Sequence, residues 1–72
     1  MPQITDEEIE TRFTYHPPKD DQPERYVQLR DQTKGLAYLI RDLTPESREQ
    51  SLALTHLEQV MFYASAAIAR RE

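Results

Sequence analysis

The segment from Arg12 to Lys19, which reads RFTYHPPK, concentrates groups that together could bind a nucleotide. Aromatic rings stack on nucleobases of any sequence, and lysine and arginine bind phosphate groups. The double proline restricts the backbone, so less conformational freedom is lost when a ligand binds. The candidate binding residues are Phe13, Tyr15, His16 and Lys19, followed closely by Arg25, Tyr26 and Arg30.

The same segment also has a purely structural explanation. Phe13 and Tyr15 would pin a short preceding helix to the rest of the protein, as in a hydrophobic staple. His16 would cap that helix, and Lys19 would remain solvated. The spacing alone favours this structural explanation over a nucleotide pocket.

A second candidate site lies at SREQS, residues 47–51. The free N–H groups and the dipole at the start of a helix attract anions. The spacing would allow a phosphate or a base edge to be bound by Arg48, Ser51 and Thr55. On spacing alone, ordinary helix capping with Arg48 in a surface ion pair explains the pattern better. Arg70, near the end of the same helix, is typical of cations that complement the helix dipole.

The sequence does not indicate an enzyme. The acidic residues 6–10 are typical of a solvated first helical turn. No serine has a base and an orienting group nearby in the sequence, although His56 could fold close to one. Without a glycine-rich phosphate loop, a cysteine or more than two histidines, neither a metal site nor a cofactor is expected.

Composition limits the partners. The formal net charge of −4 argues against polymeric nucleic acid but leaves room for a small anion in a local cationic pocket. The most apolar run, residues 60–69, is far too short to span a membrane. A chain of 72 residues without disulfides buries little surface alone, so oligomerisation is expected. The lack of cysteine also fits an intracellular protein.

Helical periodicity predicts three helices that would position these residues. A capping box that begins at Thr5 starts a short first helix, which must end by His16 because prolines follow. A second helix is expected from an acidic cap near Asp21, and a third with Thr44 as its cap and Pro45 in its first turn. The short connection between the last two forces an antiparallel hairpin.

The apolar stripes of these two helices are wider than a hairpin needs. The predicted seam consists of Tyr26, Leu29, Thr33, Leu36, Ile40 and Leu43, facing Leu54, Leu57, Met61, Ala64 and Ile68. The remaining apolar side chains must face other subunits or a ligand, and an oligomer interface or core is the simpler explanation. Gly35 indicates either tolerance on an exposed face or the close approach of another helix or a ligand.

Two separated motifs resemble a known family. RFTYHPPK with DQPERY, and PESREQSLALTHLEQVM with ASAAIAR, resemble the phage anti-CBASS cyclic-nucleotide sponges, which share a helical-hairpin domain with the phage anti-Thoeris sponges. The resemblance covers roughly residues 12 to 71. It implies a compact helical hexamer with pockets between subunits. Such a protein binds cyclic di- and trinucleotide messengers of bacterial defence and sequesters them without cleavage.

The resemblance also implies roles for single residues. Tyr15 and Phe13 would stack on bases. The groups that would meet phosphates or base edges are His16, Lys19, Arg25 or Arg30. The residues of the intersubunit pockets or of their supporting shell would be Arg48, Ser51, Thr55 and Arg70. The sequence departs from the family pattern at Asp20, where we expect a glycine, and near Tyr63 and Ser65, where we expect a tryptophan and an asparagine.

We therefore expect an all-α protein with residues 1–72 as a single domain: a short N-terminal helix, a proline turn and a long antiparallel helical hairpin, assembled as a symmetric hexamer. The expected function is to sequester cyclic oligonucleotides in the cytoplasm of an infected bacterium, so that CBASS effectors are not activated. A helical protein-binding module that docks through RFTYHPPK is the alternative. An enzyme that hydrolyses the messenger is the third and most remote hypothesis.

Overall fold

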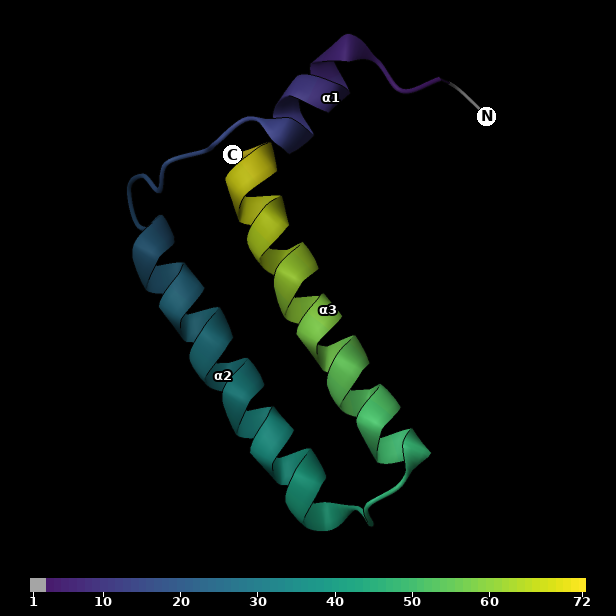
Figure 1. Cartoon of the computed structure of the whole chain (residues 1–72). Coiled ribbons are helices and arrows are strands. Elements are labelled where there is room, and N and C mark those ends of the chain that lie inside the picture. Colours follow the sequence, from purple (N-terminus) through teal and green to yellow (C-terminus); the bar gives the residue numbers. More distant parts are fainter. Residues whose placement is uncertain (1–2) are drawn as a thin grey trace.

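The structure is a computed structural model that describes residues 3–72. It contains three helices, α1 (Asp6–Phe13), α2 (Gln22–Leu43) and α3 (Arg48–Arg71). Helices α2 and α3 form a long antiparallel hairpin, and α1 lies near the last turn of α3, joined to α2 by a non-helical segment (Figure 1). Residues 3–72 contain no strand, so the all-α prediction is confirmed.

Helix α1 begins where the capping box predicts. The hydroxyl of Thr5 accepts a hydrogen bond of 3.1 Å from the backbone N–H of Glu8 and so satisfies one of the free donors of the first turn. The helix ends at Phe13, within the limit that the prolines set. RFTYHPPK therefore comprises the last two residues of α1 and six residues of non-helical chain.

The chain turns after the two prolines and not at them. The backbone N–H of Gln22 donates to the carbonyl oxygen of Lys19 at 2.9 Å, which closes a turn around Asp20 and Asp21. Asp20 has a φ of 52°, a left-handed conformation that costs a residue with a Cβ about 1 kcal/mol. Glycine adopts this conformation without that cost, which gives a physical reason for the glycine that the family resemblance led us to expect here.

The start of α2 agrees with the prediction in position but differs in detail. Pro23 lies in the first turn, where its missing N–H costs nothing. Asp21 precedes the helix, but its carboxylate makes no capping hydrogen bond. It lies instead 3.2 Å from Nε of Arg25, one turn along the helix.

Helix α3 begins later than the sequence suggested. Ser47 is its N-cap, because the Ser47 hydroxyl accepts a hydrogen bond of 3.1 Å from the backbone N–H of Gln50. The expected cap at Thr44 is therefore wrong, and Thr44 ends α2 as its C-cap. The connection is still only four residues long, residues 44–47, and the hairpin is antiparallel as predicted (Figure 1).

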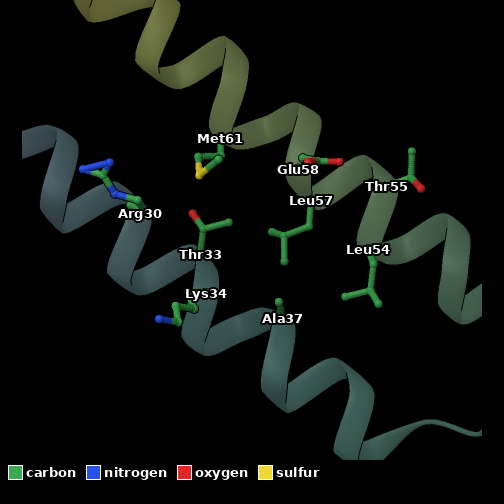
Figure 2. Close-up of a pocket in the computed structure, with 9 residues that line it drawn as sticks. All are labelled: Arg30, Thr33, Lys34, Ala37, Leu54, Thr55, Leu57, Glu58 and Met61. Carbon is green, nitrogen blue, oxygen red and sulfur yellow. The ribbon is translucent and has the colours of Figure 1, made fainter.

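The facing sides of α2 and α3 carry the half-buried residues. All five residues of the predicted α3 stripe are half-buried, and Leu57 and Met61 point toward α2 (Figure 2). On α2 the seam passes through Ala37, whereas Leu36 and Leu43, which the sequence placed in it, are exposed. The half-buried residues of the seam are Tyr26, Leu29, Thr33, Ala37, Ile40, Leu54, Leu57, Met61, Ala64 and Ile68.

The described part of a single copy has no fully buried hydrophobic core. Within residues 3–72 no hydrophobic side chain is fully buried. The chain exposes 6158 Å², whereas a folded monomer of 8.5 kDa exposes about 4,700 Å². The difference of roughly 1,500 Å² is close to what two interfaces of ordinary size would cover. No helix of the described part is long and apolar enough to cross a bilayer.

Gly35 lies on an exposed part of α2. A Cβ added at this position would meet no atom within 4 Å. Within one chain the glycine is therefore explained by its exposed face, and any close neighbour would have to come from another molecule.

Candidate functional site

The non-helical segment and the end of α3 enclose a pocket of about 420 Å³, which we call the loop pocket. Its volume lies within the range of about 300–1,000 Å³ that is typical of small-molecule sites. Three of the predicted binding residues line it together, namely His16, Lys19 and Arg70. The other lining residues are Pro17, Pro18, Gln22, Ala69 and Glu72.

Hydrogen bonds fix two of these side chains. Nε2 of His16 lies 2.7 Å from the carbonyl oxygen of Thr11, and it must donate because a carbonyl oxygen only accepts. His16 therefore satisfies a carbonyl near the end of α1, as the structural explanation of the segment requires, while it also lines the pocket. Nζ of Lys19 donates to the backbone carbonyl oxygen of Glu72 at 2.8 Å, which brings the lysine to the end of α3.

The carboxylate of Glu72 is held by the first turn of α2. Nη1 of Arg25 donates to its Oε2 at 2.8 Å, Nη2 donates to Oε1, and Nε2 of Gln22 donates to Oε1 at 3.1 Å. The bidentate Arg25 contact, with a smaller contribution from Gln22, lowers the pKa of Glu72 to about 2. The same contact raises the pKa of Arg25 above its ordinary value.

A second bidentate pair joins α3 to α1. Nη1 and Nη2 of Arg71 donate to the two carboxylate oxygens of Glu8 at 3.1 and 2.6 Å. Nε of Arg12, one turn along α1, donates to the same carboxylate at 3.0 Å. Arg71 and then Arg12 lower the pKa of Glu8 to about 2. The last two residues of the chain thus connect α3 to both α1 and α2.

These two carboxylates predict an acid-sensitive end of the hairpin. Both pKa values are lowered from 4.5 to about 2, so the pairs stabilise the folded arrangement above pH 4.5 and lose that effect as the pH falls through about 2. We expect carboxyl NMR titrations of Glu8 and Glu72 to have midpoints well below 4.5. In Arg71→Gln the midpoint of Glu8 should rise while that of Glu72 stays low. Wild-type midpoints near 4.5 would show that the pairs do not form in solution.

The two aromatic residues of RFTYHPPK project into solvent. Phe13 is 83% exposed and Tyr15 is 80% exposed, so neither pins α1 to the hairpin within one chain. The structural explanation therefore fails for these two side chains, although it holds for His16. Exposed aromatic rings can stack on a flat ligand or contact another subunit.

Tyr26 and Arg30 line other hollows on the hairpin. Both contribute to a pocket of about 420 Å³ between the start of α2 and α3, together with Ser65. Arg30 also lines a groove of about 440 Å³ along the hairpin, which Thr55 borders from α3 (Figure 2). Thr33 and Ala37 point into this groove from α2, and the side chain of Thr55 points away from α2 (Figure 2).

Arg48 and Ser51 lie elsewhere. Both belong to the first turn of α3, at the opposite end of the hairpin from the loop pocket (Figure 1). One chain therefore cannot bring all the predicted binding residues into a single site.

Within residues 3–72 no group of three or more His, Cys, Asp or Glu side chains is placed to hold a metal ion.

A family model settles the relationship to known proteins. The model of the Acb2/Tad1 hairpin domain matches residues 5–69, which is nearly the whole chain. The chain belongs to the Acb2/Tad1 hairpin-domain family. This is the family of the anti-CBASS and anti-Thoeris sponges, so the resemblance drawn from the two sequence motifs is confirmed. No curated protein and no solved structure compared with the chain matches it.

The match to the Acb2/Tad1 hairpin domain contains the whole of RFTYHPPK and ends just before Arg70. Sequence reasoning missed the two other polar residues of the loop pocket, Gln22 and Glu72. Gln22 is the most buried described residue, at 3% exposure, yet a glutamine in a first helical turn carries no sequence signal of burial. Glu72 could not be recognised because its partners are 47 to 53 residues away in the sequence.

Proposed function

We propose that this protein binds cyclic oligonucleotide second messengers, cyclic dinucleotides or trinucleotides, and sequesters them without cleavage. Its place of action is the cytoplasm of an infected bacterium, where removal of the messenger keeps CBASS effectors inactive. Membership of the Acb2/Tad1 family, which is known for sequestering cyclic nucleotides, supports this proposal. The whole chain, residues 1–72, acts as one binding domain.

The observation that carries the proposal is the loop pocket. In a chain with a net charge of −4 it gathers Lys19, Arg70 and His16 around one hollow. Lys19 and Arg70 supply positive charge for phosphates, and His16 supplies a ring for a base edge. Tyr15 and Phe13 lie just before the pocket in the sequence, with rings exposed for stacking.

The remaining predicted binding residues fit a site that is shared between subunits. Arg48 and Ser51 lie at the far end of the hairpin, so they reach a ligand of the loop pocket only through another copy of the chain (Figure 1). The excess exposed surface of a single copy supports such an assembly, a symmetric hexamer by family resemblance. Tyr26, Arg30 and Thr55 would line shared pockets, and Arg25 would support them from behind through its contact with Glu72.

Sequestration needs tight binding but no stabilised transition state. His56, which the sequence left as a possible base, contacts Oε1 of Gln59 on its own helix at 3.0 Å. Arg25 and Arg71, two strong cations near the loop, are engaged with carboxylates of the same chain. Membership of a family of sponges favours a binding protein over a hydrolase.

The exposed apolar side chains also favour one alternative, a helical module that binds another protein through Phe13 and Tyr15. The two functions differ in their ligand. A protein-binding module would bind its partner at a fixed stoichiometry and would not bind nucleotides.

The deciding experiment is titration calorimetry of the purified protein with cyclic di-AMP, cyclic GMP–AMP and cyclic tri-AMP. We expect submicromolar binding of at least one, followed by recovery of the intact nucleotide after the protein is denatured. Recovery of linear products would identify a hydrolase. The absence of binding by folded, oligomeric protein would overturn the proposal in favour of the protein-binding module.

A further inference from the structure

Glu72 joins three groups from the other side of the loop pocket. Its backbone carbonyl oxygen accepts from Nζ of Lys19 at 2.8 Å. Its carboxylate accepts from Gln22 at 3.1 Å and from both terminal nitrogens of Arg25. One residue at the end of α3 therefore contacts the turn that follows the prolines and the first turn of α2.

Within residues 3–72, few other contacts hold the loop, residues 14–21, to the rest of the protein. In residues 3–72 every hydrogen bond between residues 14–25 and the end of α3 involves Glu72. The bond from His16 to Thr11 stays within the N-terminal part, and the bond from the Lys19 N–H to Gln22 is local. Phe13 and Tyr15 are exposed, so apolar packing does not hold the loop either.

A carboxylate beside an anion pocket has two possible effects. It can oppose a bound phosphate by repulsion, or it can hold the surrounding cations in position. The contacts favour positioning, because the Glu72 charge is already paired with Arg25 in a bidentate contact. Lys19 uses one of its three donors on the main-chain oxygen of Glu72, so two donors remain for a ligand.

We propose that Glu72 is the positioning residue of the loop pocket. It holds Lys19, Gln22 and Arg25 against the end of α3, so that the cationic pocket exists before a ligand arrives. A preformed pocket binds more tightly because less freedom is lost on binding. Arg25 thereby acts through Glu72 and does not touch the ligand. The inference rests on the proposed function, since the ligand is a phosphate-bearing cyclic nucleotide.

The test is Glu72→Gln in the full chain, titrated with cyclic di-AMP, cyclic GMP–AMP and cyclic tri-AMP. We expect about a tenfold loss of affinity for each nucleotide that the wild type binds, because the loop must then be ordered on binding. Glu49→Gln is the matched control. It removes the same charge from an exposed carboxylate at the other end of α3, one that forms no ion pair within the described residues.

A double-mutant cycle separates positioning from direct contact. If Arg25 acts through Glu72, then Arg25→Gln should weaken binding by about the same factor as Glu72→Gln. The double variant should then be no worse than either single one. If Arg25 instead contacts the phosphate, its replacement will cost more, and the two losses will multiply.

Hydrogen exchange in the absence of ligand gives a readout that general destabilisation would not reproduce. In Glu72→Gln the amides of Lys19 and Gln22, which are hydrogen-bonded within the turn, should exchange faster, whereas those in the middle of α2 and α3 should not change. The oligomer mass and melting temperature should match those of Glu49→Gln. If Glu72→Gln assembles poorly, the same exchange experiment is made on Arg25→Gln. This variant removes the other partner of the Arg25–Glu72 ion pair, and its exchange then tests the inference.

The outcomes are distinct. If the wild type binds a nucleotide and Glu72→Gln binds it equally well, the inference is wrong and the proposed function stands. Tighter binding by Glu72→Gln would also overturn it, because the carboxylate would then be opposing the ligand. If the wild type binds none of the three nucleotides, the proposed function fails, and a role for Glu72 in ligand affinity fails with it.

Discussion

Replacement of Tyr15 by alanine should greatly weaken the binding of at least one cyclic nucleotide and leave the oligomer intact. The ring is 80% exposed in a single chain and makes no packing contact whose loss would unfold the hairpin. Stacking of a base on an aromatic ring contributes about 1–3 kcal/mol, so one lost stack weakens binding about 5- to 150-fold. Calorimetry of Tyr15→Ala against the wild type measures this loss.

Two control variants sharpen the assignment to Tyr15. Tyr15→Phe keeps the ring and loses only the hydroxyl, so its affinity should stay close to that of the wild type. Phe13→Ala removes the neighbouring exposed ring at the end of α1 and shows whether that ring stacks as well. Unchanged affinity in Tyr15→Ala would show that Tyr15 is not part of the proposed ligand site.

Introduction of a charge at Val60 should dissociate the proposed oligomer and unfold the chain at the same time. Val60 is 61% exposed on α3, and a single copy buries no hydrophobic side chain fully within residues 3–72. A carboxylate at a subunit interface would be buried without a partner, at a cost of about 3–5 kcal/mol. Val60→Asp should therefore sediment as a monomer and lose helical signal at concentrations where the wild type is assembled.

The neighbouring Gln59→Asp is the matched control, because it adds the same charge at an exposed polar position. It should sediment like the wild type. The wild type itself should melt at a higher temperature as its concentration is raised, since assembly and folding are linked. A wild-type chain that is monomeric and melts cooperatively at a temperature independent of concentration would contradict the need for an oligomer.

Local rules predicted most of the secondary structure. The Thr5 cap, the end of α1 before the prolines and the antiparallel hairpin all follow from interactions within a few residues. The cap of α3 was misplaced because two hydroxyl residues, Thr44 and Ser47, lie within one turn of each other. The sequence does not say which hydroxyl will reach a free N–H; in the structure Ser47 does.

The sequence by itself determined the helices, the wide apolar surface and, through two motifs, the family. It also identified His16, Lys19 and Arg70 as candidate ligand residues. Only the tertiary structure decided which of these meet, because the pocket forms where residues 16–22 fold against residues 69–72. The physical reason is distance along the chain. Helix capping and periodicity act over three or four residues, whereas the contacts of Glu72 with Lys19 and Arg25 depend on the length of the hairpin that returns α3 to the loop.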